Sequence, residues 1–247
     1  MTKTEIRRIL LTNKAWSIYP LADLDEDLFP HCDWFTLPNR NALAMVFKGI
    51  AIRPIFVLGD AEETRTLLEA MPERTGYLNL LPHQVDSAQG IYQYQTRQEM
   101  QRMLLENLRP RPGETIALTI RDADDILKLY ATGTGGGIAF APFQLNTTFF
   151  RGIRREGELI AVAGVQVASR SEGVAAIGNI YVHPRHRNQG LAQVVTTAVA
   201  QALGEAGIPT IGLNVERSNA PAIAAYEKIG FRRAFSYCEG IAQKVVK

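Results

Sequence analysis

The chain of 247 residues is long enough for one large domain or two small ones. Its 46% hydrophobic and 21% charged residues are typical of a packed globular protein and exclude the intrinsically disordered class. The net charge of +2 is too small to predict a nucleic-acid-binding protein, and only a local basic patch would indicate such binding.

The N-terminal half carries short apolar runs that predict an α/β region. Residues 42–58 contain two strand-like runs, and Gly59-Asp60 predicts a turn into a helix near 61–71. Residues 76–81 predict another strand, whereas residues 96–107 fit either class of element.

The clearest boundary lies at Pro110, Pro112 and Gly113, because two prolines and a glycine within four residues stop any helix or strand. We therefore expect an N-terminal α/β domain of residues 1–109 and a second domain of residues 114–247. We expect the first domain to be degenerate and to form one wall of the binding site of the second. A separate domain with its own ligand is the alternative.

The second domain shows a sharper pattern of alternating strands and helices. In chain order we expect a buried strand over 116–120, a helix after Asp122 that buries Ile126, Leu127 and Tyr130, a hairpin of 149–154 and 159–168, a strand over 174–182, a helix over 191–203, a strand over 210–215, a helix from Ser218 or Asn219 to a stop at Gly230, and a last strand. This order predicts an α/β fold with a mixed sheet.

Two cysteines, Cys32 and Cys238, do not make a disulfide framework. The N-terminal apolar run Ile9–Leu11 is far shorter than a secretory segment, and no stretch approaches the ~20 apolar residues of a membrane span. We therefore expect a reduced, cytoplasmic protein with neither nucleic-acid nor membrane partners.

The segment 182–192 joins a strand directly to a helix, which suits a pyrophosphate. The first helical turn leaves about four N–H groups unpaired and carries a partial positive charge. Gly190 lets the backbone approach phosphates without a Cβ, Ala192 keeps the next position small, and Arg187 adds charge. Taken alone, this pattern also fits an ordinary helix start.

A second pattern follows 27 residues later. Asn219 and Tyr226 are seven residues apart, so they share one helix face two turns apart. Taken alone, this helix fits equally well a capping asparagine and a core tyrosine.

Together the two segments resemble the GNAT superfamily of N-acetyltransferases, over about residues 115–235. The signature V-x-P-x-x-[RQ]-x-x-G-x-[GA] is filled by Val182, Pro184, Arg187, Gly190 and Ala192, and N-x-x-A-x-x-x-Y-x-x-x-G-F by Asn219, Ala222, Tyr226, Gly230 and Phe231. The resemblance implies a GNAT-type mixed β-sheet flanked by helices, in a branch with an extra N-terminal α/β region. It also implies that two parallel strands, ending near Val182 and Val215, splay apart around the cofactor.

The resemblance implies acetyl-CoA as the acetyl donor, no metal, and a primary amine on a small molecule or peptide as the acceptor. It assigns backbone contacts with the acetyl and pantetheine groups to Ile180, Tyr181 and Val182. It assigns backbone contacts with the pyrophosphate, beside Arg187, to Asn188, Gln189, Gly190, Leu191, Ala192 and Gln193. It assigns a pantetheine contact to Asn219 and a catalytic contact with the sulfur to Tyr226.

Acetyl transfer needs a neutral amine, a stabilised oxyanion and a donor for the leaving thiolate. A phenol of pKa ~10 is protonated at pH 7, so Tyr226 suits the thiolate, and a backbone N–H of residues 180–182 suits the oxyanion. Several family members carry a glutamate as base in an L-E-V motif, where this chain has Asn214. Glu216 and a water chain are the remaining candidates, and we leave the base unassigned.

Three further motifs have weaker functional interpretations. The glycine-rich run 133–137 follows a helix, so we expect a mobile loop near the acceptor rather than a nucleotide loop. His183 and His186 lack a third ligand nearby, which argues against a metal. The run 31–33, His-Cys-Asp, we assign to ordinary packing.

Two alternatives to an acetyltransferase stay open. One is a non-catalytic acetyl-CoA sensor, which Asn214 favours and Tyr226 disfavours. The other is an acyltransferase for longer acyl-CoA, because the sequence does not set the room beside the thioester. The sequence also leaves open the acceptor's identity and the oligomeric state.

Overall fold

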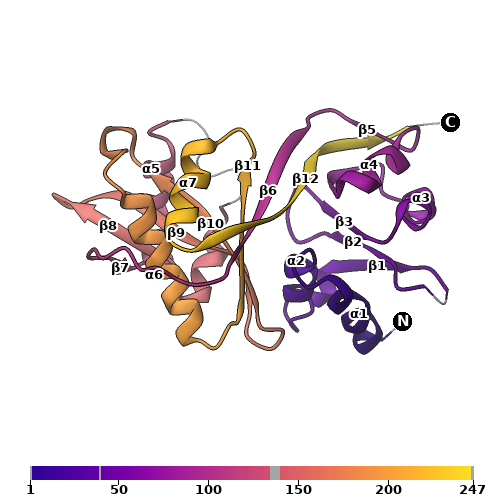
Figure 1. Cartoon of the computed structure of the whole chain (residues 1–247), viewed down its shortest axis with the longest axis horizontal. Helices are drawn as coiled ribbons and strands as arrows, with labels where there is room; N and C mark the ends of the chain where they lie inside the picture. Colours follow the sequence, from indigo (N-terminus) through magenta and orange to yellow (C-terminus); the bar gives the residue numbers. More distant parts are fainter. Residues whose placement is uncertain (1, 39, 134–139, 246–247) are drawn as a thin grey trace. The chain divides into compact units, whose positions relative to one another are not determined.

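The computed structural model describes residues 2–38, 40–133 and 140–245, which fall into two compact units (Figure 1). Unit 1 comprises Met1–Arg102, Glu216–Ser218 and Ala234–Lys247, and unit 2 comprises Met103–Val215 and Asn219–Arg233. The units therefore depart from the expected segments 1–109 and 114–247. The physical reason is that the strands β6 (Gln98–Leu105) and β12 (Phe231–Lys244) contribute residues to both units.

Unit 1 is an α/β body whose sheet has the strand order β1-β2-β3-β4-β12, with β5 also paired to β12. Only the β3–β4 pair is parallel among the pairs described within this unit. Its elements are α1 (Lys3–Leu10), α2 (Ile18–Ala22), β1 (Cys32–Thr36), β2 (Leu43–Phe47), β3 (Pro54–Leu58), α3 (Ala61–Ala70), β4 (Thr75–Leu80), α4 (Pro82–Ala88) and β5 (Tyr92–Tyr94), with 3-10 turns at Leu11–Asn13 and Phe29–His31.

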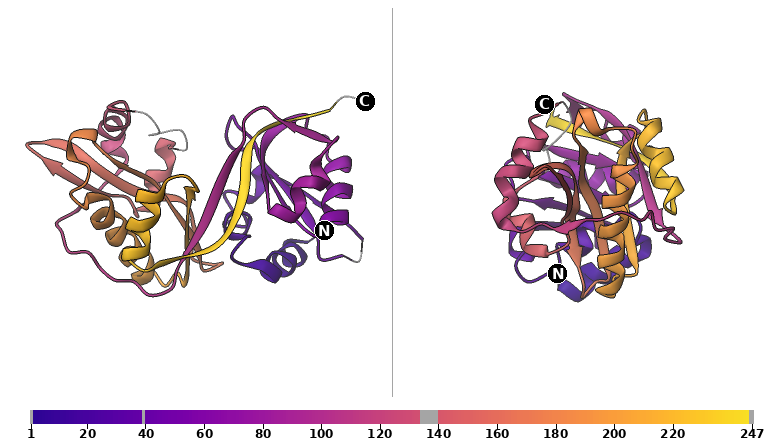
Figure 2. Two further views of the ribbon diagram at one scale, coloured as in Figure 1. Left: turned by 45° about the horizontal axis from the view of Figure 1, so that its top comes forward. Right: turned by 90° about the vertical axis from the view of Figure 1, so that its left-hand side faces the viewer.

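Helical segments cover both faces of the unit 1 sheet, which explains why β2 and β3 are almost continuously buried. On one face, Val57 packs in a core cluster with Leu67 and Leu68 of α3, beside which α4 lies (Figures 1 and 2). On the other face, Phe56 packs against the ring of Trp16 at 5.3 Å between centroids. The expected strands over 42–58 and 76–81, and the helix near 61–71, are thus present.

Unit 2 holds the mixed sheet predicted for the second domain, in the order β11-β10-β9-β8-β7. The β10–β11 pair is parallel and the β7–β8, β8–β9 and β9–β10 pairs are antiparallel. Its elements are β7 (Ile116–Ala117), α5 (Ala123–Tyr130), β8 (Arg151–Arg155), β9 (Glu158–Ser169), β10 (Val174–Val182), α6 (Leu191–Glu205), β11 (Thr210–Glu216) and α7 (Ala220–Lys228), with 3-10 turns at Ile120–Asp122, Pro142–Thr147 and Pro184–His186. Figure 2 shows α5 on one side of this sheet and α6 on the other.

The buried strand expected over 116–120 is wrong in extent and burial. Only Ile116 and Ala117 pair, with Gly152 and Arg151, and both paired residues are exposed. The core takes Leu118 instead, whose N–H donates to the Phe150 carbonyl at 3.0 Å. The segment lies at the end of the sheet order, so the strand has a partner on one edge alone.

Helix α5 begins where expected but uses its side chains differently. Asp122 makes no side-chain cap, and its carboxylate instead accepts from Thr119 N–H at 2.9 Å and Arg154 Nη2 at 2.8 Å. Ile126, Leu129 and Tyr130 lie on one helix face at i, i+3 and i+4 and are buried, whereas Leu127 lies off that face and is 48% exposed.

Candidate active site

The parallel strands β10 and β11 separate at their carboxyl ends. Their described pairing runs from Val174 with Thr210 to Ile177 with Leu213 and goes no further. The β9–β10 register also shifts on either side of Gly178, and Asn179 takes a left-handed φ of 55°. The backbone of residues 180–182 therefore lies beyond the parallel ladder, on the strand segment expected to contact an acetyl group.

The turn between β10 and α6 leaves the start of α6 open. Asn188 and Gly190 both have left-handed φ angles, 62° and 77°. Gly190 is the N-cap residue, no side chain caps the helix, and the first turn holds no acidic residue. The first backbone bond of the helix runs from Val194 N–H to the Gly190 carbonyl at 3.2 Å. The uncapped N–H donors and the helix dipole together favour an anion here.

Arg187 holds the end of β10 rather than pointing into solvent alone. Its Nε donates to the Val182 carbonyl at 3.3 Å, and its guanidinium lies 5.7 Å from the centre of the Tyr181 ring. Tyr181 is only 6% exposed and packs edge-on against Tyr130. The side chain of Tyr181 thus belongs to the core, and only its backbone remains for a ligand.

Gln193 couples the phosphate-binding turn to the second motif. It is buried in the first turn of α6, and its Nε2 donates to the Ala225 carbonyl of α7 at 3.2 Å. Leu191 and Ala192 are half-buried beside it. The sequence predicted only a backbone role for Gln193, whereas in the structure its side chain also links α6 to α7.

Helix α7 displays the two residues expected to reach the cofactor. Asn219 caps the helix, because its Oδ1 accepts from Ala222 N–H at 3.1 Å, and its amide nitrogen remains exposed. The helix ends before Gly230, whose φ of 106° marks the predicted stop.

Tyr226 combines a buried ring with an available hydroxyl. The side chain is 8% exposed, its ring packs edge-on against Phe231, and within the described chain its hydroxyl makes no hydrogen bond. Burial raises the pKa of Tyr226 to about 12, because the phenolate would lose hydration. The phenol therefore stays protonated at neutral pH and can donate.

Two arginines that the sequence did not assign flank the turn. A Cβ on Gly190 would lie 2.6 Å from the guanidinium of Arg111, so that group rests against Gly190. On β8, Arg155 donates from Nη1 to Gln189 Oε1 at 3.0 Å. Neither contact has a local sequence signal, because the partners are 79 and 34 residues apart in the chain.

Two residues of β11, Asn214 and Glu216, bear on the choice of a base. Asn214 is half-buried on β11 and cannot accept a proton from an amine as a carboxylate would. Glu216 is exposed, accepts from Ser218 Oγ at 2.6 Å, and is grouped with unit 1, where the neighbouring Arg217 N–H donates to the Glu99 carbonyl at 2.8 Å.

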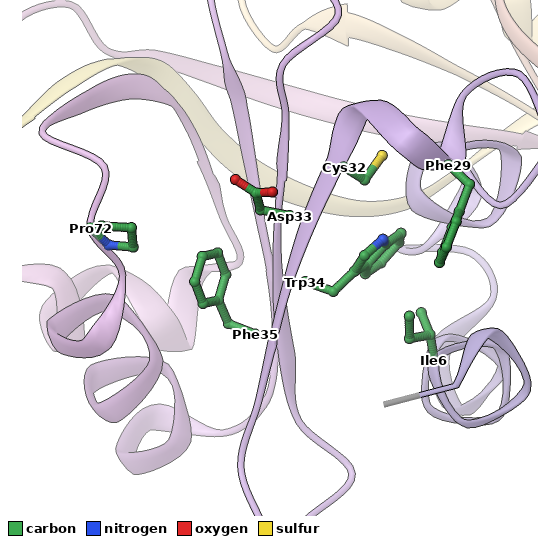
Figure 3. A pocket seen from close by; sticks show the side chains of 7 residues that line it. All are labelled: Ile6, Phe29, Cys32, Asp33, Trp34, Phe35 and Pro72. Carbon is green, nitrogen blue, oxygen red and sulfur yellow. The ribbon is translucent and has the colours of Figure 1, made fainter.

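The weaker motifs show no built site. Cys32 lines a shallow recess of unit 1 with six other side chains (Figure 3), and its thiol donates to the Leu28 carbonyl at 3.6 Å. Burial raises the pKa of the Cys32 thiol well above its usual range, so it is not an activated nucleophile. Residues 134–137 of the glycine-rich run lie outside the described residues.

The residues that the structure describes offer neither a cluster of metal ligands nor a membrane-spanning helix. No three His, Cys, Asp or Glu side chains there are grouped so as to hold a metal ion. His183 and His186 have rings 5.5 Å apart, with Arg155 rather than an acid beside His186. In the same residues, no helix has both the length and the apolar character to cross a membrane.

Residues 120–231 match the model of the acetyltransferase (GNAT) family. The chain is 35% identical over 82 residues to the [ribosomal protein bS18]-alanine N-acetyltransferase of Escherichia coli, which covers 33% of this chain and 53% of that protein. It is 33% identical over 88 residues to a mycothiol acetyltransferase of Paenarthrobacter aurescens, covering 34% of this chain and 27% of that protein. The chain thus spans about half the length, or less, of these curated relatives.

Solved structures share the fold over more of the chain. The GCN5-related N-acetyltransferase from Kribbella flavida superposes with a TM-score of 0.65 and 14% identity, covering 94% of this chain and 96% of that one. At this identity the likeness concerns the fold alone. It extends to the N-terminal region, which the family model does not cover.

Proposed function

Since residues 120–231 of this chain form a domain of the GNAT acetyltransferase family, we propose that the protein transfers the acetyl group of acetyl-CoA to a primary amine. The acceptor class is a small-molecule or peptide amine. One curated relative is named for an alanine of a ribosomal protein and another for mycothiol, so the relatives support both a peptide and a small-molecule acceptor. The free cysteines Cys32 and Cys238 are in keeping with a reduced, cytoplasmic setting for the reaction.

The observation that carries the proposal is the uncapped start of α6 beside the parted strands β10 and β11. Asn188 and Gly190 are left-handed, no side chain caps the helix, and its first turn holds no acidic residue. These features fit a pyrophosphate, with the N–H groups of residues 188–193 as its donors. The backbone of residues 180–182, beyond the ladder, then serves the pantetheine and acetyl end, with Asn219 beside it.

The acetyl donor supplies a carbonyl activated as a thioester. In the proposed reaction, the amine nitrogen forms a bond to this carbonyl carbon, and a backbone N–H of residues 180–182 stabilises the developing oxyanion. The carbon–sulfur bond then breaks, and Tyr226 donates its phenolic proton to the departing sulfur. The acceptor nitrogen releases its proton to a base, for which Glu216 and water remain the candidates.

A non-catalytic acetyl-CoA sensor is the second candidate. Asn214 favours it, because β11 offers no carboxylate where several family members have one. The available phenol of Tyr226 favours turnover instead. Release of free thiol from acetyl-CoA in the presence of a panel of amines distinguishes the two, because a sensor binds acetyl-CoA without releasing thiol. Replacing acetyl-CoA by longer acyl-CoA in the same assay tests the acyl-chain preference.

Substitution of Gly190 tests the binding site directly. We expect the protein to bind acetyl-CoA with an affinity on the order of micromolar, and Gly190→Glu to weaken it by more than about 100-fold. A glutamate there strains a left-handed residue and places a negative charge at the phosphates.

The matched control is Gly207→Glu at the other end of the same helix. Gly207 has a nearly identical φ of 78°, and a Cβ there meets open space. Gly207→Glu introduces the same charge and the same backbone strain at a site distant from the turn, so this variant should retain its affinity for acetyl-CoA. Isothermal calorimetry that finds equal affinity in Gly190→Glu and the unmodified protein would reject the site.

A further inference from the structure

Residues 106–113 form an extended strap along unit 2. The Glu106 N–H donates to the Gly230 carbonyl at 3.2 Å, and the Arg109 N–H donates to the Ile229 carbonyl at 3.0 Å. A Cβ at Gly230 would overlap the Asn107 carbonyl, so the strap lies directly against the end of α7. This first half of the strap is therefore tied by backbone contacts to the helix that carries the catalytic candidate.

The second half of the strap crosses the first turns of α6. The Arg111 N–H donates to Thr197 Oγ1 at 3.4 Å, and a Cβ on Gly113 would lie 2.6 Å from Val194 Cγ1. Pro110 and Pro112 flank Arg111 and fix their own φ angles, which limits how far the backbone at Arg111 can move. The strap thus presents a single side chain, that of Arg111, at the open helix start.

The Arg111 guanidinium lies against the open start of α6, beside the position proposed for the phosphates. Its Cζ, Nε and Nη2 atoms are each 2.6 Å from the Cβ position of Gly190, the uncapped N-terminal residue of α6. Within the described residues this guanidinium has no carboxylate partner and makes no side-chain hydrogen bond. By contrast, the guanidinium of Arg155 already donates a hydrogen bond to Gln189.

A cation packed against the positive end of a helix is unfavourable without a counter-charge. A phosphate seated on the α6 N–H groups would supply that charge, and a guanidinium is the side chain that binds phosphate oxygens in a planar, two-pronged manner. Gly190 then has a second role, because any larger residue would push the guanidinium away from the turn.

We propose that Arg111, held by the strap, is a side-chain ligand of the cofactor pyrophosphate. This inference rests on the proposed function and adds to it a residue outside both family signatures. The pyrophosphate is preferred over the 3′-phosphate because Arg111 contacts Gly190 within the pyrophosphate turn itself.

The test measures dissociation constants of the full-length protein for acetyl-CoA and for acetyl-dephospho-CoA, which lacks the 3′-phosphate. We expect Arg111→Ala to raise both constants by the same factor, roughly 10- to 100-fold, as for loss of a charge-assisted hydrogen bond. Affinity should also become less sensitive to salt, which loss of a purely structural contact would not cause. Arg111→Lys, which keeps the charge without the planar fork, should recover part of the affinity.

Arg109→Ala is the matched control, since Arg109 lies exposed on the same strap and contacts α7 through its backbone. It should bind both ligands as the unmodified protein does. An unchanged constant in Arg111→Ala, or an equal loss in Arg109→Ala, would overturn the assignment of Arg111. If Arg111→Ala weakens the binding of acetyl-CoA but not of acetyl-dephospho-CoA, Arg111 binds the 3′-phosphate, and its assignment to the pyrophosphate is overturned. If the unmodified protein binds no acetyl-CoA, the proposed function itself fails, which separates the two conclusions.

Discussion

Helix α3 of unit 1 and helix α6 of unit 2 both follow a strand, and their first turns are completed in opposite ways. At α3, Asp60 accepts from Glu63 N–H and Glu63 accepts from Asp60 N–H, each at 2.9 Å. Two carboxylates thereby satisfy the open donors and oppose the helix dipole. At α6, Gly190 offers no side chain and the first turn has no acid.

The contrast shows that a helix start can bind an anion when it lacks a capping side chain and acidic residues in its first turn. A closed start such as that of α3 keeps its N–H donors occupied by its own chain. The open start of α6 leaves them for a ligand, with left-handed Asn188 and Gly190 turning the preceding backbone aside. The two stabilising carboxylates of α3 are thus absent where we propose that phosphates bind.

The largest expected effect comes from separating the units. If the open helix start depends on unit 2 alone, a fragment of residues 103–233 should fold and bind acetyl-CoA. A fragment of residues 113–247 should not fold. It lacks the strap residues that bond to Ile229 and Gly230, and it leaves β12 without its partner β4. Circular dichroism on heating and acetyl-CoA titration check both fragments.

A well-folded 113–247 fragment with full affinity would contradict this division of the chain. The earlier prediction that residues 1–108 wall the acceptor site is a different claim and stays a prediction. It requires that the 103–233 fragment bind acetyl-CoA yet lose acetyl transfer to the amine that the full chain uses.

The next effect separates binding at α6 from chemistry at α7. Tyr226→Phe should lower kcat by roughly 10- to 1000-fold with little change in acetyl-CoA affinity, because the phenol donates as negative charge develops on sulfur. Single-turnover kinetics measure the chemical step. An unchanged rate would leave Tyr226 as a core aromatic, packed on Phe231.

The pH profile offers an independent check on Tyr226. Burial raises its pKa to about 12, so the neutral phenol persists above the ordinary range of tyrosine ionisation near pH ~10. A fall of activity caused by its ionisation should therefore lie near pH 12, and should be absent in Tyr226→Phe. The same raised pKa means that its contribution to stability is present below pH ~10 and is lost as pH rises through the folded-state value.

The smallest expected effect is at the closed helix start. Asp60→Ala should reduce the stability of unit 1 by about 1 kcal/mol, as for the loss of an N-cap, and leave acetyl-CoA affinity unchanged. Urea unfolding and calorimetry measure the two quantities. A change in affinity would mean that the two helix starts are not independent, contrary to the comparison drawn above.

Local signals in the sequence were enough for the elements around the site. The strand over 174–182 has the predicted bounds, because an apolar run between the turn at Gly173 and Pro184 admits little else. Asn219 begins α7 and Gly230 follows its end, since capping and left-handed termination depend on a few neighbouring residues.

Burial and strand length were less predictable where tertiary contacts decide them. Leu127 and Leu129 are equally apolar, and the packing of α5 against β9 and β10 decides that Leu129, together with Ile126 and Tyr130, faces the core. The strand at Ile116 ends at Ala117, which pairs with Arg151, the first residue of the partner strand β8.

The sequence by itself determined the strand, turn and helix around residues 182–192, the Asn219–Tyr226 helix and hence the resemblance to the family, because those signals lie within short stretches of chain. Only the tertiary structure decided that Arg111 rests on Gly190 and that β12 contributes to both units. Both features join residues far apart in sequence, through packing that no local propensity encodes. Whether the Arg111 guanidinium contacts the start of α6 depends on the path of the whole folded chain, and not on the residues next to Arg111 in the sequence.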